Sequence, residues 1–129
     1  MTADTSGMET AGDLTLVPCG GRWDAVKVPR WIAVQALKQL KGKHGAVIVD
    51  PRERALYFLV PPQSTSGWTV QYTSPLSTAS YVAVPPSSKE SGPGVYWLTS
   101  PVHGPVHTRT GLLRVVIEET LGPQMKVAL

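Results

Sequence analysis

The sequence predicts an α+β fold, in which a mostly antiparallel sheet has two helices packed on one face. Segments of strand-like and helical periodicity follow one another in the order strands, helix, hairpin-connected strands, helix. The pattern Tyr-x-x-Val-Pro-Pro occurs at 57–62 and again at 81–86, and each copy has the form of a short apolar strand ended by two prolines. The 12 prolines fall mainly at predicted strand ends, which agrees with short strands and many loops.

The first part of the chain combines two strands with one helix. Residues 13–19 and 23–28 have the apolar patterns of strands. Residues 30–41 repeat at helical spacing and place their apolar side chains along one stripe. Pro29 suits the first turn of that helix, since its missing N–H would be unpaired there, and Gly42 supplies a stop. We therefore expect an amphipathic helix to follow the second strand directly.

The second part of the chain predicts a hairpin, further strands and a last helix. Residues 46–60 form the hairpin, in which two apolar strands flank a turn that contains Pro51. Further strands are expected at 68–72, 81–84 and 95–98. Thr110 can cap a helix over residues 111–121, and the Gly-Pro pair that follows would end it.

One domain is expected at residues 13–123, between a disordered tail at 1–12 and a flexible C-terminal tail at 124–129. No segment approaches the roughly 20 apolar residues of a membrane span, and no signal-peptide pattern opens the sequence. The single cysteine, Cys19, cannot build a disulfide framework. A small buried hydrophobic residue is its expected role, and a nucleophile or zinc ligand is the alternative. Together these features predict a cytoplasmic protein without membrane contact.

Basic residues are concentrated around the first predicted helix. The net charge is +3, whereas residues 22–44 are rich in Lys and Arg and contain a single acidic residue. Helical projection places Trp31, Gln35 and Lys38 in one row opposite the apolar stripe. An exposed tryptophan beside lysines can stack on a nucleic-acid base or anchor a protein partner; a further loop folded over Trp31 is the alternative. The expected binding residues are Trp31, Gln35, Lys38, Lys41, Lys27, Arg30 and Lys43.

Part of the chain resembles a known catalytic domain. Four segments carry the resemblance: 56–61, 68–71, 81–87 and 92–97. They are similar to successive segments in the later half of the primase–polymerase domain of bacterial bifunctional DNA primase/polymerases. In that family the strands are of the His-x-Tyr-Phe, Val-Asp-Val-Arg and Gly-Gly-Tyr-Val-Val-x-Pro-Pro-Ser kinds. The overlap spans residues 46–98, and the whole chain is also similar to small stand-alone actinobacterial proteins.

The positions where this family holds its catalytic groups carry other residues here. Primase–polymerase chemistry needs clustered carboxylates that hold divalent metal against the triphosphate, and a basic group that binds it. Ala55 occupies the position of the family's histidine, and Thr69 that of its later aspartate. The paired Asp-x-Asp/Glu is reduced to Asp50 and Glu53, and Asp50 lies in a predicted turn, where a carboxylate accepts backbone hydrogen bonds. The resemblance therefore implies a primase–polymerase-like module without its catalytic centre.

Other residue groupings do not predict catalysis or metal binding. His103 and His107 have a helical spacing, but the Gly-Pro pair between them disfavours a helix, so solvated loop histidines are expected. The pair Gly20-Gly21 lacks the remaining residues of a phosphate-binding loop, and the serine-rich segments lack a nucleophile elbow. We expect no catalytic residue, no metal site and no cofactor.

These features predict a non-catalytic binding or regulatory domain that contacts a protein partner through the Trp31 and Lys38 face of its helix. A nucleic-acid-binding accessory protein is one alternative, and the modest net charge favours a protein partner over it. A residual nucleotide-binding or hydrolytic enzyme that uses Asp50, Glu53 and a histidine is a second alternative. A homo-oligomer built on exposed strand edges is a third.

Overall fold

The computed structural model describes the backbone of residues 14–127 and the side chains of residues 14–122. Its strands are β1 (Thr15–Pro18), β2 (Asp24–Pro29), β3 (Val47–Asp50), β4 (Ala55–Val60), β5 (Ser74–Leu76), β6 (Tyr81–Val84) and β7 (Tyr96–Thr99). Its helices are α2 (Arg30–Leu40), α3 (Thr110–Val127) and the short 3-10 helix η1 (Pro101–His103). The expected N-terminal tail at 1–12 lies outside the described residues, as do residues 128–129 of the expected C-terminal tail.

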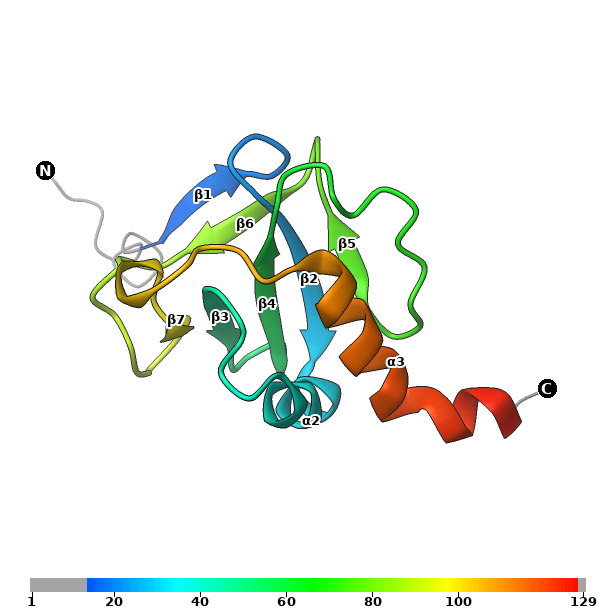
Figure 1. Ribbon diagram of the computed structural model, residues 1–129. Coiled ribbons are helices and arrows are strands. Elements are labelled where there is room, and N and C mark those ends of the chain that lie inside the picture. The colour runs from blue at the N-terminus through cyan, green and yellow to red at the C-terminus, as the bar shows by residue number, and fades with distance from the viewer. Residues whose placement is uncertain (1–13, 128–129) are drawn as a thin grey trace, which may run out of the picture.

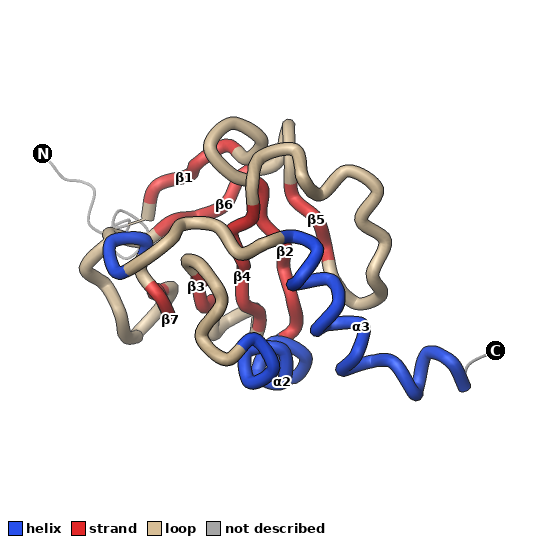
Figure 2. The backbone as a smooth tube through the Cα atoms, viewed as in Figure 1, coloured by secondary structure: helices blue, strands red, loops and turns tan. Residues whose placement is uncertain are grey.

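Five strands form one antiparallel sheet in the order β5-β2-β4-β3-β7, and β1 pairs with β6 in a second, two-stranded antiparallel sheet. The hairpin predicted at 46–60 is present, with β3 and β4 paired so that Asp50 lies opposite Ala55. The helices α2 and α3 pack against each other on one face of the five-stranded sheet (Figures 1 and 2). The predicted α+β fold class is therefore confirmed.

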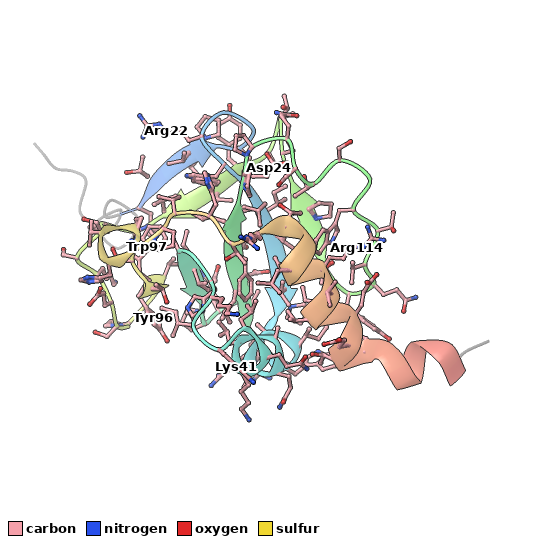
Figure 3. The ribbon with its side chains drawn as sticks, in the orientation of Figure 1. Arg22, Asp24, Lys41, Tyr96, Trp97 and Arg114 are labelled. Atoms are coloured by element: carbon pink, nitrogen blue, oxygen red, sulfur yellow. The ribbon has the colours of Figure 1, made fainter. Side chains whose placement is uncertain are left out.

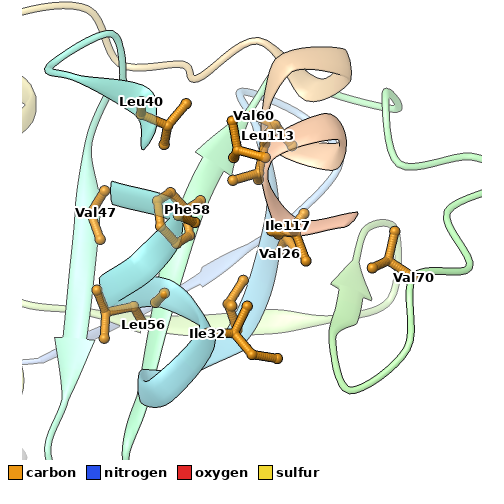
Figure 4. Close-up of a cluster of buried hydrophobic side chains, with 14 of the residues drawn as sticks. Val26, Ile32, Leu40, Val47, Leu56, Phe58, Val60, Val70, Leu113 and Ile117 are labelled. Carbon is orange, nitrogen blue, oxygen red and sulfur yellow. The ribbon is translucent and has the colours of Figure 1, made fainter. Parts of the chain in front are cut away.

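The core between the helices and the sheet arises where two sequence periodicities coincide. Alternate residues of β2 and β4 point toward the helices, and α2 turns one apolar stripe toward the sheet. The side chains that meet there include Val26, Val28, Ile32, Ala33, Ala36, Leu40, Val47, Leu56, Phe58, Val60, Leu113, Val116, Ile117 and Leu121 (Figure 4). Burial of each large apolar side chain contributes about 1.5–3 kcal/mol. This core fixes α2 on the sheet.

The opposite face of the sheet is covered by strands rather than by helices. A second buried cluster forms there from Cys19, Trp23, Ala25, Ala46, Ile48, Leu59, Val82 and Trp97. Val82 comes from β6, and Cys19 directly follows β1, so the two-stranded sheet closes this face. The two Tyr-x-x-Val-Pro-Pro copies consequently lie in different sheets, the first in β4 and the second in β6.

The prediction of a strand at 68–72 is wrong. Trp68 and Val70 are buried in a turn-rich loop, where Trp68 Nε1 donates a hydrogen bond to Thr73 Oγ1 at 2.8 Å. The strand of this region is β5, which pairs with β2 at the edge of the sheet. Its central Pro75 has no N–H to donate, which an edge strand tolerates, but proline obscures the strand pattern in the sequence.

The predicted end of the last helix is also wrong, because α3 continues past Gly122 and Pro123 to Val127. A proline removes one hydrogen bond from a helix, yet its fixed φ angle is compatible with helical backbone. The C-terminal end of α3 projects beyond the sheet (Figure 1). Neither of the two long helices within residues 14–127 has the length and apolar character needed to cross a membrane.

Candidate binding surface on α2

The helix α2 presents one polar row to solvent, as the helical projection predicts. Pro29 is the last residue of β2 rather than the first of the helix, so strand pairing fixes the point where α2 begins. Trp31 is 57% exposed, and Gln35 and Lys38 are exposed on the same row. The helix ends where Lys41 adopts a left-handed backbone with a φ of 50°.

A second aromatic side chain lies against Trp31. The ring of Tyr72 meets the Trp31 ring edge-on, with centroids 5.7 Å apart and an interplanar angle of 66°. Tyr72 is itself 62% exposed, so the loop that carries it contacts Trp31 without covering it. The alternative in which a loop buries Trp31 is therefore excluded. Two large aromatic side chains lie together at the surface.

The loop between β4 and β5 holds Tyr72 in an uncommon backbone conformation. Its φ of 70° is in the left-handed region, which costs a bulky residue about 1–2 kcal/mol. Trp68 and Val70 of this loop are buried in the helix-side core, and Thr73 Oγ1 donates a hydrogen bond to the Val70 carbonyl at 2.7 Å. These contacts on both sides of Tyr72 fix its ring beside Trp31.

A shallow depression of about 580 Å³ lies next to Trp31, and it is lined by Arg30, Trp31, Val34, Gln35 and Arg54. The Arg30 backbone N–H donates a hydrogen bond to the Arg54 carbonyl at 2.9 Å, which joins the β3–β4 turn to the start of α2. Sequence reasoning missed Arg54 and Tyr72 because both arrive from turns distant in the sequence. It missed Val34 because that residue lies between the apolar stripe and the polar row.

Lys27, another predicted binding residue, is engaged elsewhere. Alternation along β2 places it on the sheet face opposite α2. Its Nζ pairs with Glu53 Oε1 at 3.1 Å and lies 5.9 Å from the centre of the Tyr57 ring. The hydrogen bond with Glu53 raises the pKa of Lys27. This lysine is bound to a carboxylate and is not part of the Trp31 row.

The remaining predicted lysines lie toward the C-terminal end of α2. Lys41 is exposed at the end of the helix (Figure 3). Lys43 lines a separate hollow together with His44, His107 and Arg109. The structure thus brings Arg30, Trp31 and Gln35 to one depression, with Lys38 next along the row, and places Lys27 and Lys43 outside it.

The acidic residues of the hypothetical residual enzyme make structural contacts. Asp50 Oδ1 accepts hydrogen bonds from the backbone N–H groups of Arg52 at 3.1 Å and Glu53 at 3.2 Å, as expected for an aspartate in this turn. The Glu53 carboxylate pairs with Lys27. Across the described part of the chain, no three His, Cys, Asp or Glu side chains are grouped in a way that could hold a metal ion.

A buried carboxylate that the sequence did not indicate is Asp24, which is 0% exposed (Figure 3). It accepts hydrogen bonds from Thr65 Oγ1 at 2.7 Å, the Thr65 backbone N–H at 3.3 Å and Ser77 Oγ at 3.0 Å. Burial acts to raise the pKa of Asp24, but the hydrogen bonds from Thr65, Gln63 and Ser77 outweigh it and lower the pKa. Asp24 therefore ties β2 to two loops as a carboxylate.

The cysteine and the two histidines considered as candidate functional residues are engaged in contacts within the fold. Cys19 is buried, and burial followed by the nearby Asp24 charge raises its pKa to about 11, so it is a neutral thiol. This confirms the expected buried role and disfavours a nucleophile. His103 Nε2 pairs with Glu90 Oε2 at 2.6 Å, and His107 Nε2 lies 3.0 Å from the Arg22 carbonyl oxygen. Both histidines are exposed, as expected, but only His107 lies in a loop, because His103 is the last residue of the 3-10 helix η1.

Comparison of the chain with protein-family models, curated proteins and solved structures found no match.

Proposed function

We propose that this chain is a non-catalytic binding domain that contacts a protein partner. The contact would be made through a surface, called here the α2 surface, that consists of Arg30, Trp31, Gln35, Lys38, Arg54 and Tyr72. The observation that carries the proposal is the exposed Trp31–Tyr72 pair beside two arginines. Trp, Tyr and Arg are the residue types that dominate the binding energy of protein interfaces.

The exposed rings offer enough area for a substantial contribution. Covering the exposed part of each ring, roughly 100 Å², contributes about 2–3 kcal/mol at 25 cal/mol per Å². The loop that carries Tyr72 is already anchored by Trp68 and Val70, so little conformational entropy is lost when a partner binds. The Trp31–Tyr72 pair is therefore better suited to the centre of an interface than aromatic side chains that become ordered only when a partner binds.

Nucleic-acid binding is the second candidate function, and the primase–polymerase resemblance supports it. A base would stack on Trp31 while Arg30 and Arg54 contact phosphates. The net charge of only +3 and the apolar Val34 in the same depression favour a protein. Salt separates the two functions, since several phosphate contacts make affinity fall steeply with salt concentration.

A residual nucleotide-binding enzyme would require Asp50 and Glu53 to release their present hydrogen bonds. We expect no Mg²⁺-dependent rise in melting temperature with nucleotides, because a ligand raises stability only when it binds the folded state. A nucleotide-dependent rise in melting temperature that Asp50→Ala abolishes would support the residual-enzyme alternative.

Affinity capture from native cell extract tests the proposed function. Wild type is compared with Trp31→Ala/Lys38→Ala, with and without nuclease. A matched control, Val115→Ala/Lys43→Ala, changes an exposed valine and an exposed lysine outside the α2 surface. We expect a protein that wild type and control retain, that the Trp31 variant loses, and that nuclease does not affect. Retention that disappears with nuclease would favour nucleic acid, and equal retention by all three would show that another surface binds.

A further inference from the structure

A groove lies between α2 and the outer strands of the sheet, adjacent to the α2 surface. The helices cover the sheet only in part, and β7 is the outermost strand on the side away from α3 (Figure 1). The apolar side chains along the groove include Val34, Leu37, Val49, Leu56, Tyr96 and Leu98. Its volume is about 220 Å³, enough for a few side chains but below the 300–1,000 Å³ typical of small-molecule pockets.

The strands direct apolar side chains into this groove. Trp97 packs into the core on the opposite face, so alternation along β7 places Tyr96 and Leu98 on the helix side (Figure 3 labels Tyr96). Leu98 is 46% exposed, and Val34 across the groove is 39% exposed. A row of apolar side chains is thus exposed beside α2, on the part of the sheet that the helices do not cover.

The charges at the rim of the groove are predominantly positive. Arg30 and Arg54 line the groove where the start of α2 meets the β3–β4 turn. Among the described residues that line the groove, Asp50 is the one carboxylate, and it already accepts two backbone hydrogen bonds. A partner segment that carries negative charge beside its apolar side chains therefore complements the groove.

The groove and the depression beside Trp31 form one continuous surface. Arg30, Val34 and Arg54 line both. A segment laid along α2 can bury its apolar side chains between Val34 and Leu98 while its carboxylates reach Arg30 and Arg54. Bidentate pairing of arginine with a carboxylate would also fix the orientation of the segment.

We infer that the α2–β7 groove binds a short, acidic amphipathic segment of a protein partner, with its apolar side chains on Val34 and Leu98 and its carboxylates on Arg30 and Arg54. This inference rests on the proposed protein-binding function and specifies its partner. A second copy of this chain fits less well, because a two-fold contact would bring the arginines of both grooves together. A nucleic acid would leave the apolar floor of the groove without a complementary surface.

Selection from a library of random 16-residue displayed peptides on the full-length protein tests the inference. We expect the enriched peptides to carry a net negative charge and apolar residues at i, i+3 or i+4, and i+7. Enrichment of basic or uncharged peptides would overturn the inference, and so would a failure to enrich any peptide.

The affinities of the best enriched peptide for matched variants locate its binding site. We expect Leu98→Gln and Arg54→Glu each to weaken binding at least tenfold. Two controls make the same kinds of change elsewhere: Val115→Gln alters a side chain that is 48% exposed, and Arg22→Glu reverses an exposed charge. Both controls should bind within twofold of wild type, with unchanged circular dichroism in all four variants.

The variants also separate failure of the groove from failure of the proposed function. Loss of binding with Trp31→Ala but not with Leu98→Gln would keep the α2 surface as the interface and overturn the groove. Binding that survives both substitutions would overturn both. Equal weakening by Arg54→Glu and Arg22→Glu would show that only overall charge matters, which also overturns the groove.

Discussion

Trp97 and Trp31 lie on opposite sides of the five-stranded sheet in opposite environments. Trp97 is 2% exposed, its Nε1 donates a hydrogen bond to the Pro85 carbonyl at 3.1 Å, and its backbone N–H donates to the Lys89 carbonyl at 2.8 Å. Trp31 is 57% exposed, and its ring forms a T-shaped contact with the ring of Tyr72. The chain thus covers Trp97 almost completely and leaves more than half of the Trp31 side chain exposed. The same residue type stabilises the fold on one side and is available for contact on the other.

The largest expected loss of stability is on the side of the sheet where Trp97 is buried. Trp97→Ala should lower the free energy of unfolding by about 3–5 kcal/mol, because it opens a cavity in the second core and leaves the Pro85 carbonyl without its donor. Chemical denaturation followed by circular dichroism measures the loss. A change below about 1 kcal/mol would show that the β1–β6 side is not packed as described.

The hydrogen bonds of Asp24 tie β2 to the loops at Thr65 and Ser77. Their removal should lower the free energy of unfolding slightly less than Trp97→Ala does. Asp24→Ala should destabilise the fold by on the order of 3 kcal/mol, since the buried hydroxyl of Thr65 and the half-buried hydroxyl of Ser77 lose their acceptor. Asp24→Asn keeps the size of the side chain and should cost less. Equal stability of Asp24→Ala and wild type would contradict this role.

Asp24 also predicts a dependence of stability on pH. Its pKa is lower in the folded protein than in the unfolded chain, where it is about 3.9. The unfolded state therefore takes up the proton first on acidification. The stabilisation is fully present above about pH 4 and is lost as the pH falls through the folded-state pKa. Denaturation midpoints from pH 7 to pH 2 should decline less in Asp24→Asn than in wild type, and parallel curves would refute the assignment.

Gly45 marks a close backbone approach between the residues just before β3 and the segment that leads into α3. A Cβ there would lie 2.5 Å from the His107 carbonyl carbon and 2.6 Å from the Val106 carbonyl oxygen. Gly45→Ala should therefore destabilise by about 1–3 kcal/mol, because backbone cannot move aside as a flexible side chain can. Gly21→Ala, where no atom lies within 4 Å of a Cβ, is the matched control and should differ little from wild type. Equal stability of the two variants would exclude this close approach.

The smallest effect on stability is expected on the side of the sheet that carries the exposed Trp31. Trp31→Ala loses the edge contact with Tyr72 and should cost no more than about 1 kcal/mol. Its effect on partner binding should be larger, at least 2 kcal/mol. A stability loss that matches that of Trp97→Ala would remove the contrast between the two tryptophans.

Local patterns predicted the parts of the fold that local chemistry determines. The helix at α2 follows from its apolar stripe and from the proline and glycine that bound it, and the β3–β4 hairpin follows from two apolar runs around a turn. Pairing of β1 with β6 depends on contacts distant in the sequence, which no local pattern encodes. The strand β5 was missed because Pro75 lies at its centre.

The candidate surface was predictable only where a helix carries it. Helical projection located Trp31, Gln35 and Lys38, because residues three and four apart share a face. Tyr72 and Arg54 adopt left-handed backbone conformations in loops, and no periodicity indicates where such side chains point. Lys27 was assigned to the surface from its place in a basic segment, yet strand alternation turns it to the other face, where it pairs with Glu53.

The most direct test of the α2 surface is the nuclease-treated affinity capture with wild type and Trp31→Ala/Lys38→Ala, measured together with the melting temperature of each. We expect a partner protein bound by wild type to be lost from the variant while the melting temperature changes by only a few degrees. Equal retention of that protein by both would contradict the proposal that Trp31 and its neighbours form the interface.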